Sequence, residues 1–410
     1  MDRKLHIALF TDTYYPEING VATSVYLLKQ ELEKRGHEVY VITTTTKNAP
    51  KPEMEHNVLR VPSLPCLLIT ERRVGLFYQP KLAHKIRQLH LDIIHTQTEF
   101  SLGIFGRIMA KELHLPLVHT YHTIYEDYTH YFMKFKSLDE RAKSFVRVFT
   151  KICCNTVERV IVPTDKVRKL LLDYQVTQSI HVIPTGIDLS KFDPANYNKT
   201  EILALRQSFG ISPEEKVILY LGRISQEKNL EELLLYIPSF LEQHSNAKFL
   251  IIGGGPDKEY LIRFIEKQQN LSEASRQRII FGGEQPWDII GKFYQLGDVF
   301  VSASNSETQG LTYIEAMASS LPVVAKQDPC LEDILEQGYN GYTFTDKNGF
   351  LSGLEQVLYS EKSSEYGKHS IEKVKKYSTA EFAKNIEKIY RELETQAYIK
   401  EEDKKIPLRL

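Results

Sequence analysis

The segment GRISQEKNL, residues 222–230, places two cations where an apolar, strand-like run gives way to a helical pattern. Arg223 and Lys228 are the cations, and Gly222 lets the backbone of the loop come close to a ligand. A helix N-terminus already attracts anions through unpaired N–H groups and the helix dipole, so the added cations suit the binding of a diphosphate. The competing interpretation is an ordinary pair of surface cations at the start of a helix.

A second segment, SNSETQGLTYIEAMASSLP at residues 304–322, carries two carboxylates. Glu307 stands in a predicted loop, and Glu315 lies about two turns further along, on the helix that begins near Gly310. Carboxylates accept hydrogen bonds from hydroxyls, and free N–H groups near Gly310 can bind a phosphate. Each glutamate alone could be an ordinary solvated side chain. Their occurrence together, directly after a strand, is less common and favours a binding site.

Both segments belong to a longer alternation of β-rich apolar runs and helical patterns, which predicts an α/β protein. Near-continuous apolar strands joined by helices are typical of parallel sheets covered on both faces, so we expect two doubly wound, Rossmann-like domains. In such sheets ligands bind beyond the carboxyl ends of the strands. The predicted strands lie at residues 6–10, 38–45, 92–97, 116–121, 159–164 and 181–185, and then at 217–225, 248–256, 278–284, 298–304 and 321–326.

A Gly-, Asp-, Pro- and Asn-rich stretch at residues 185–200 interrupts the alternation and is typical of a linker. It predicts a first domain at residues 1–190 and a second at 191–380. The last pattern, 378–405, is one long charged helix, and we expect the C-terminal segment 381–410 to pack back on the first domain. The first predicted helix has an apolar stripe that Gly36 is placed to end, formed by Val21, Val25, Leu28 and Leu32.

The composition is that of a soluble globular protein, since 42% of the 410 residues are hydrophobic and 26% are charged. No window has the roughly 18 apolar residues that span a bilayer, and the first apolar run is too short for a signal peptide, so we expect a cytosolic protein. The four cysteines show no C-x-x-C spacing, which favours reduced thiols over disulfides or a zinc site. Residues 1–190 hold 25 Lys/Arg against 20 Asp/Glu, whereas residues 191–410 hold 27 against 33.

Gly222-Arg223-x4-Lys228 and Glu307-x7-Glu315, in this order on the second of two Rossmann-like domains, resemble the retaining glycosyltransferases of the GT-B fold, family 4. The resemblance covers nearly the whole chain and implies a nucleotide-sugar donor. It implies that Arg223 and Lys228 hold the donor diphosphate and compensate the charge of the leaving group. Glu315 would bind the ribose hydroxyls and Glu307 the hydroxyls of the transferred sugar. The cradle would be completed by Gly222 and by the backbone N–H groups of Gln309, Gly310 and Leu311.

Two positions of the first domain match the same family. In FTDTYYPEINGVATSV, residues 10–25, Gly20 matches a glycine whose backbone approaches the diphosphate, although many relatives carry Gly-Gly where this chain has Asn19-Gly20. His122 matches a histidine that reaches the donor sugar. From the residues alone, Gly20 is equally explained as a cap or turn glycine, and His122 as a satisfied core histidine.

A metal ion is not expected. His119, His122 and His130 show no H-E-x-x-H spacing, and the chain has no Asp-x-Asp motif of the kind that usually binds a donor diphosphate through a divalent cation. Arg223 and Lys228 can supply the positive field directly, so no cofactor is expected beyond the donor substrate. The family resemblance implies same-face substitution, in which the leaving phosphate oxygen takes the acceptor proton.

Residues 64–90 and 130–154 mix apolar, aromatic and basic side chains. This composition suits an anionic membrane interface, and it suits a pair of ordinary amphipathic helices equally well. The positive balance of the first domain agrees with a membrane-facing role.

The strings HTQTEFSLG (95–103) and EDYTHY (126–131) are similar to those of bacterial diacylglycerol glucosyltransferases. The likeness implies UDP-glucose as donor, diacylglycerol as acceptor and a peripheral location at the cytoplasmic membrane surface. Glu99 and Asp127 would lie near the acceptor, without an assigned role. Two alternatives stay open: a transferase with a phosphoinositide, polyprenyl-linked or soluble glycan acceptor, and a non-catalytic nucleotide-sugar-binding protein. No nucleic-acid partner is expected.

Overall fold

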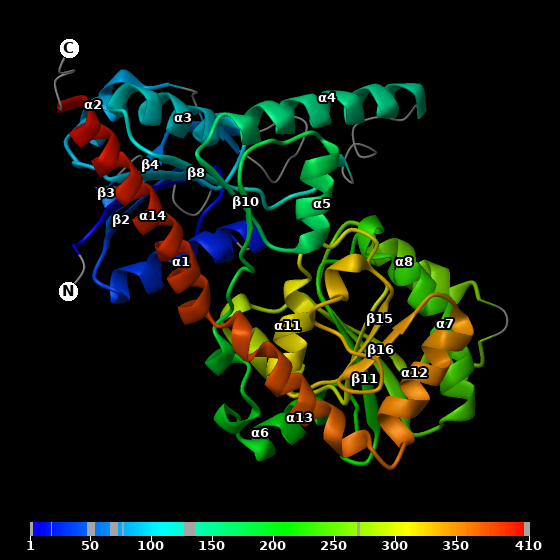
Figure 1. Cartoon of the computed structure of the whole chain (residues 1–410). Coiled ribbons are helices and arrows are strands. Elements are labelled where there is room, and N and C mark those ends of the chain that lie inside the picture. The colour runs from blue at the N-terminus through cyan, green and yellow to red at the C-terminus, as the bar shows by residue number, and fades with distance from the viewer. Residues whose placement is uncertain are drawn as a thin grey trace. The chain divides into compact units, whose positions relative to one another are not determined.

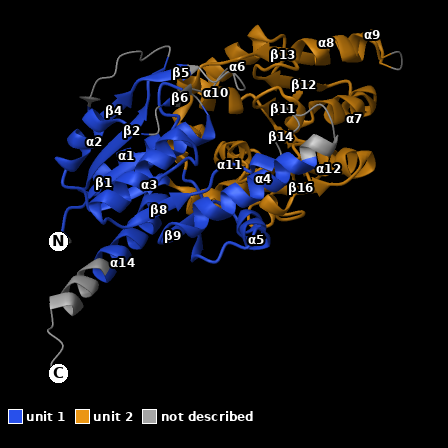
Figure 2. Ribbon diagram, turned by 90° about the horizontal axis from the view of Figure 1, so that it is seen from above, with its two compact units in different colours: residues 1–186, 379–410 blue, residues 187–378 orange. Residues whose placement is uncertain are grey.

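The chain forms two compact units (Figure 2). Unit 1 comprises residues 1–186 and 379–410, and unit 2 comprises residues 187–378. The C-terminal helix therefore belongs to the same unit as the N-terminal residues, although all of unit 2 lies between them in the sequence. The computed structural model describes residues 3–17, 19–46, 54–65, 73–75, 78–126, 136–268 and 271–405.

Unit 1 is built on one sheet with the strand order β10-β9-β8-β7-β1-β2-β4-β3, parallel except for the edge strand β3. Its strands are β1 (His6–Phe10), β2 (Glu38–Thr44), β3 (Met54–Glu55), β4 (Val58–Val61), β7 (Ile93–Thr96), β8 (Leu117–Thr120), β9 (Arg159–Val162) and β10 (Ile180–Val182). A separate antiparallel pair is formed by β5 (Ser63–Pro65) and β6 (Arg73–Gly75). The helices are α1 (Gly20–Lys34), α2 (Pro80–Arg87), α3 (Ser101–Leu113), α4 (Lys136–Asn155), α5 (Asp165–Asp173) and α14 (Thr379–Lys405).

Both faces of the unit 1 sheet are covered, because its strands are apolar on both sides. Alternate residues of β1 enter different cores: Ala8 and Phe10 join the cluster that contains Phe105 of α3. Ile7 and Leu9 join the cluster that α1 and α14 complete. Helix α14 packs on α1, so the last helix of the chain closes one face of the first sheet (Figure 1).

The apolar stripe predicted for the first helix is confirmed. Val21, Val25, Leu28 and Leu32 of α1 are all buried, and the chain leaves the helix through Gly36 at a φ of +93°. That left-handed backbone favours glycine, which has no Cβ to clash.

Unit 2 holds a second, wholly parallel sheet with the strand order β13-β12-β11-β14-β15-β16. The strands are β11 (Lys216–Leu221), β12 (Ala247–Ile252), β13 (Ile279–Gly283), β14 (Val299–Ser302), β15 (Val323–Lys326) and β16 (Gly341–Phe344). The helices are α6 (Lys199–Ser208), α7 (Leu230–Gln243), α8 (Lys258–Glu266), α9 (Glu273–Arg276), α10 (Ile290–Tyr294), α11 (Leu311–Ala318), α12 (Lys347–Tyr359) and α13 (Ser363–Val374). The two sheets confirm the predicted fold class of two Rossmann-like domains.

Some elements were not predicted. Among them are the short strands β4 and β16, of four residues each. The stretch predicted as a linker folds within unit 2 from Ile187 onward, where it forms the 3₁₀ turn η2 (Leu189–Lys191) and the start of α6.

Each sheet has one point at which its strand order reverses. In unit 1 the reversal lies between β1 and β7, and in unit 2 between β11 and β14. The loops that leave two such strands diverge to opposite sides of the sheet, which opens a crevice where ligands of α/β proteins bind. The loops after these four strands are therefore the first places to look for a site.

None of the described helices combines the length and the apolarity that crossing a bilayer requires. Cys153, Cys154 and Cys330 are buried, while Cys66 lies outside the described residues.

Candidate active site

The reversal point of unit 2 brings a predicted cation and a predicted carboxylate together. Lys228 ends the 3₁₀ turn η4 (Gln226–Lys228) after β11, and Glu307 lies in the loop after β14. Lys228 Nζ donates to Glu307 Oε1 at 2.6 Å. The two loops are also joined by their backbones, since Asn305 N donates to the carbonyl oxygen of Glu227 at 3.2 Å. Adjacent strands thus hold opposite charges face to face.

The Lys228–Glu307 pair is only partly shielded. About a quarter of the Lys228 side chain (24%) remains exposed, against 12% of the Glu307 side chain. Removing one partner of a partly buried ion pair is costly, so each side chain holds the other in place. An ammonium held in this way can turn to a phosphate oxygen without a large change of position.

Arg223 lies in the exposed part of the same loop, directly after β11. Its carbonyl oxygen accepts a hydrogen bond of 2.8 Å from the buried hydroxyl of Tyr220. The backbone of the loop is therefore held by Tyr220 of β11, while Arg223 itself is exposed to solvent. The structure places Arg223 and Lys228 on one loop, as the sequence predicts.

Glu315 sits on α11 beside a residue that the sequence did not single out. The hydroxyl of Tyr294, which is buried on α10, donates to Glu315 Oε2 at 2.7 Å. Burial raises the pKa of Glu315 to about 7, against the lowering effect of the Tyr294 hydrogen bond and the charge of Lys191. Glu315 is half-buried, so its carboxyl group can still reach a ligand hydroxyl.

The loop between Glu307 and α11 turns at Gly310, whose φ is +75°. A Cβ at this position would lie 2.3 Å from a ring carbon of Tyr313, so a larger residue would displace the helix start. Leu311 is the first residue of α11, and Gln309 is buried. The N–H groups that the family resemblance assigns to the phosphate and sugar cradle are thus those at a helix N-terminus, which have no intrahelical partners.

A lysine and the chain's single tryptophan form a further pair that sequence reasoning missed. Lys191 Nζ lies 3.1 Å from the ring centroid of Trp287, in η5 (Trp287–Ile289), and this nitrogen is buried without a hydrogen-bond partner. Glu315 contributes to its electrostatic surroundings. The available signals were the presence of only one tryptophan and a cation inside the predicted linker.

In unit 1, Gly20 is the exposed first residue of α1. The side chain of Asn19 caps this helix: its Oδ1 accepts from the backbone N of Ala22 at 3.0 Å, and its Nδ2 donates to Thr13 Oγ1 at 2.8 Å. The departure from Gly-Gly therefore supplies an N-cap. The cap is thus Asn19 and not Gly20, which is the first residue of the helix, and a ligand contact at Gly20 stays a prediction.

His122 follows β8 and is tied to the loop after β7. Its Nε2 lies 2.8 Å from Gln97 Oε1. Burial lowers the pKa of His122 to about 4, so the imidazole is neutral near pH 7. A neutral imidazole can form a hydrogen bond with a ligand but cannot serve as a resident cation.

The other histidines of this region have partners of their own. His119 Nε2 lies 3.1 Å from Glu99 Oε1, and His95 lies 2.6 Å from the Tyr390 hydroxyl and 2.7 Å from Thr120 Oγ1. Burial lowers the pKa of His95 and His119. His130 and Asp127 lie outside the described residues. Over the described ranges, no three His, Cys, Asp or Glu side chains are grouped so that they could hold a metal ion.

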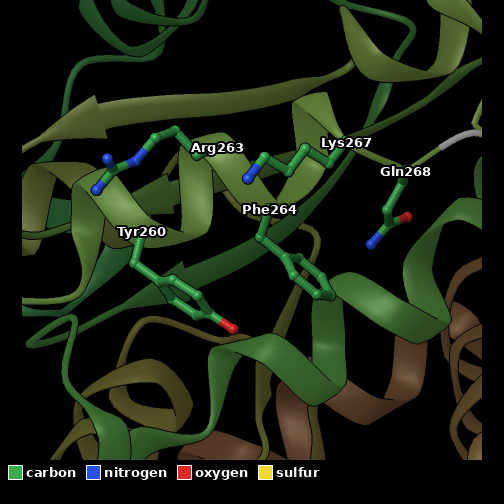
Figure 3. A pocket seen from close by; sticks show the side chains of 5 residues that line it. All are labelled: Tyr260, Arg263, Phe264, Lys267 and Gln268. Carbon is green, nitrogen blue, oxygen red and sulfur yellow. The ribbon is translucent and has the colours of Figure 1, made fainter.

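A cavity of about 310 Å³ lies along α8 in unit 2 (Figure 3). None of the predicted site residues lines it. The hydroxyl of Tyr260, one of its walls, donates to Glu231 Oε2 at 2.7 Å. Its lining residues are Tyr260, Arg263, Phe264, Lys267 and Gln268.

Comparison with known proteins now decides the family. The chain is 38% identical over 387 residues to the alpha-monoglucosyldiacylglycerol synthase of Streptococcus pneumoniae, covering 94% of this chain and 85% of that protein. It is 34% identical to the synthase of the same name from Acholeplasma laidlawii, over 95% of this chain and 97% of the relative. The family model of Glycosyltransferase Family 4 matches residues 18–191, and that of Glycosyl transferases group 1 matches residues 201–376. The chain is a family 4 glycosyltransferase.

Solved structures confirm the GT-B fold of this family 4 glycosyltransferase. Anabaena Alr3699/HepE in complex with UDP superposes with a TM-score of 0.72 at 17% identity, covering 95% of this chain and all of that one. Sucrose-phosphate synthase from Thermosynechococcus elongatus gives a TM-score of 0.71 at 19% identity, covering 95% and 99%. The predicted family, fold class and enzyme class are thereby confirmed.

Proposed function

We propose that this glycosyltransferase moves glucose from UDP-glucose to 1,2-diacylglycerol with retention of configuration, giving α-monoglucosyldiacylglycerol. The Lys228–Glu307 pair at the reversal point of unit 2 carries the proposal, because it joins a diphosphate-binding cation to a carboxylate that can accept sugar hydroxyl groups. The names of the two relatives above 30% identity support the donor sugar and the lipid acceptor.

On this proposal unit 2 binds the donor. Arg223 and Lys228 neutralise the diphosphate, the N–H groups at the start of α11 bind an anionic or hydroxyl oxygen, and Glu307 orients the glucosyl ring. Glu315 accepts hydrogen bonds from the ribose hydroxyls. Fixed cations act mainly on the charge that develops as UDP departs, so their contribution is largest in the transition state.

In the proposed transfer step, the acceptor hydroxyl oxygen forms a bond to the anomeric carbon. The bond from that carbon to the β-phosphate oxygen breaks at the same time, and the bonding pair leaves with UDP. The acceptor proton passes to the departing phosphate oxygen on the same face. His122, neutral near pH 7, is proposed to orient the sugar or acceptor through a hydrogen bond.

We also propose that unit 1 meets the anionic inner surface of the cell membrane through α4. Phe145, Val148 and Ile152 lie at spacings of three and four residues, on one side of this helix, and are 71%, 54% and 57% exposed. Arg141 is exposed on the same helix, whereas the exposed Arg147 is paired with Glu126. An apolar row with an adjacent cation suits an anionic lipid interface, where each nearby cation adds roughly 1 kcal/mol.

Helix α2, in the other segment predicted to contact lipid, has a different arrangement. Leu82, Ala83 and Ile86 are buried in the unit 1 core. Its apolar side therefore supports the fold, and α4 is the better candidate for the membrane contact.

Product identification tests the proposal. The purified protein is incubated with labelled UDP-glucose, UDP-galactose or GDP-mannose and with vesicles containing diacylglycerol or phosphatidylinositol. We expect a glucosylated diacylglycerol whose anomeric proton coupling shows the α configuration. A product with another lipid, another sugar or the β configuration would refute the corresponding part of the assignment.

A further inference from the structure

Glu99 is a buried carboxylate that the proposed transfer step does not use. It lies in the loop after β7, at the reversal point of unit 1, and is almost fully shielded from solvent. Its two oxygens have different partners: Oε1 lies 3.1 Å from His119 Nε2, and Oε2 accepts a hydrogen bond from the hydroxyl of Tyr125. The carboxylate therefore ties the end of β8 to the residues that follow it.

The loop that carries Glu99 is rigidly held. Thr98 Oγ1 donates to Asp12 Oδ2 at 2.6 Å, and the Leu102 backbone N donates to Asp12 Oδ1 at 3.0 Å. A Cβ on Gly103 would lie 1.9 Å from the carbonyl oxygen of Thr98, so the start of α3 approaches the loop as closely as glycine permits. Glu99 and its neighbour Phe100 are presented from a fixed backbone.

Four aromatic rings lead from this carboxylate to the exposed side of α4. Tyr125 meets Phe100 edge to face with ring centroids 5.3 Å apart. Phe100 stacks with Phe149 of α4 at 6.3 Å, and Phe149 stacks with Phe145 at 6.2 Å. We call Tyr125, Phe100, Phe149 and Phe145 the ring series.

The ring series runs from a buried end to an exposed end. Tyr125 and Phe149 are half-buried, whereas Phe100 is 47% exposed and Phe145, which belongs to the exposed row of α4, is 71% exposed. The rings at the exposed end are stacked on one another although they contact water. Exposing apolar surface to water is unfavourable, and exposed apolar patches commonly mark binding sites. The polar end of the series is the Tyr125 hydroxyl, with Glu99 and His119 behind it.

We propose that the ring series seats an acyl chain of the lipid acceptor, and that Glu99 is a positioning residue that fixes Tyr125 at the polar end of this seat. The inference rests on the proposed diacylglycerol acceptor and adds the residues that receive it. A chain lying along Phe145, Phe149 and Phe100 would leave the membrane from the exposed row of α4 and bring its glycerol end toward Tyr125. Apolar contact with the rings supplies the affinity for the acyl chain. The Tyr125 hydroxyl, held by Glu99, fixes the position of the glycerol end.

Photo-crosslinking tests the location without requiring transfer. The full chain is irradiated with vesicles that contain a diacylglycerol carrying a diazirine in one acyl chain, and labelled peptides are mapped by mass spectrometry. We expect labelling of the peptides that contain Phe100 and Phe149, and loss of that labelling in Phe100→Ala. If other peptides are labelled and neither of these two is, the proposal is overturned, even if the enzyme makes the expected glucolipid.

Kinetics test the role of Glu99. With monomeric short-chain diacylglycerols, we expect the wild-type acceptor KM to fall by up to about four-fold for each added methylene that is buried, the equivalent of ~0.8 kcal/mol. Phe100→Ala should flatten this dependence. Tyr125→Phe and Glu99→Gln should raise the acceptor KM while the UDP-glucose KM and vesicle binding stay at wild-type values, a split that general loss of structure would not produce.

Two control variants match these changes. Tyr78→Phe removes an exposed tyrosine hydroxyl elsewhere in unit 1, and Leu172→Ala removes an exposed apolar side chain from α5. Both should keep the wild-type chain-length dependence. Should Glu99→Gln fail to fold, Tyr125→Phe removes the same hydrogen bond from the other side.

The outcomes separate this inference from the proposed function. Crosslinking to the ring series with no glucosylated diacylglycerol would refute the proposed reaction and leave the acyl seat standing. Formation of glucosylated diacylglycerol, with an unchanged chain-length dependence in Phe100→Ala and Tyr125→Phe, would support the proposed reaction and refute the acyl seat. A shift from dimer to monomer in Phe145→Ser would show that a second copy covers the rings, and would also overturn the seat.

Discussion

The reversal points of the two sheets use the same topology for different chemistry. In unit 2, the loops after β11 and β14 bring Lys228 and Glu307 into a close ion pair. In unit 1, the loops after β1 and β7 hold Asp12 and Glu99 in buried hydrogen bonds, and the nearby His122 is neutral near pH 7 because burial lowers its pKa to about 4. The arrangement of strands alone therefore does not decide what a reversal point binds.

The difference follows from what surrounds the charges. The unit 2 pair is partly exposed, so its ions can be offered to a charged ligand, whereas the unit 1 carboxylates are already occupied by the protein's own donors. Exposed apolar side chains of α4 lie beyond the unit 1 loops instead. On our proposals, unit 2 is suited to a nucleotide diphosphate and unit 1 to an apolar acceptor.

The largest expected effect is the loss of the unit 2 cations. Lys228→Ala or Arg223→Ala should lower kcat by about 10²- to 10³-fold, the usual cost of removing one preorganised group that stabilises developing charge. Circular dichroism should show an intact fold. Lys292→Ala, which breaks an exposed pair with Glu201, is the matched control and should keep wild-type turnover. Near-normal turnover in both site variants would contradict the assignment of diphosphate binding to unit 2.

A smaller effect is expected at the membrane contact that we propose for unit 1. Phe145→Ser with Ile152→Ser should weaken binding to anionic vesicles by about ten- to a hundred-fold, because the two side chains together lose roughly 1.4–2.7 kcal/mol when each is only partly buried at the interface, less than the roughly 1.5–3 kcal/mol of each fully buried side chain. Flotation measures the binding, and high salt should weaken it further. Leu235→Ser, at an exposed position of α7 in unit 2, should bind vesicles like the wild type. Equal losses in both variants would remove the assignment of α4.

The raised pKa of Glu315, about 7, predicts a pH-dependent affinity for the donor. The carboxyl group is mainly protonated at pH 6 and ionised at pH 8, and the ionised form is the stronger acceptor for ribose hydroxyls. Affinity for UDP-glucose should therefore rise through this range by up to about ten-fold, as a charge-assisted hydrogen bond is gained. Emission of Trp287, the single tryptophan, provides the measurement. Glu315→Gln should bind more weakly and with a flat profile; an unchanged slope would assign the titration to another group.

The smallest expected effect concerns a buried histidine of unit 1. Tyr390→Phe removes the hydroxyl that lies 2.6 Å from His95 Nδ1 and should lower the free energy of unfolding by about 1–3 kcal/mol. Calorimetry measures the loss. Turnover below the melting transition should not change, because His95 of β7 is fully buried and contacts Tyr390 of α14. A marked fall in kcat with normal stability would show that unit 1 uses this histidine in the reaction.

Much of the fold could be predicted because its signals are local. The apolar stripe of α1 repeats with the helical period, and the strands that carry the site loops are apolar runs between turn-forming residues. The order of Arg223, Lys228, Glu307 and Glu315 along the chain identified the family before any geometry was known. The short strands β4 and β16 were not predicted, although β7 and β14, which have the same length, were.

The partners of the site residues depended on the tertiary structure. Tyr294 contacts Glu315 from 21 residues away in the sequence, and Glu307 contacts Lys228 from 79 residues away. A local sequence pattern does not indicate which residues pair over such separations. The role of Asn19 as the helix cap was missed because the possible cap was assigned to Gly20, one residue further along.

The amino-acid sequence by itself determined which residues are apolar, which are charged and how they repeat, and this was enough for the two sheets and for the family. Only the tertiary structure decided which of those surfaces are covered. Helices α2 and α4 both alternate apolar and basic residues, yet the apolar side chains of α2 are buried and a row of those on α4 is exposed. The physical reason is that a helical period defines a face, whereas burial depends on whatever other part of the chain packs against it.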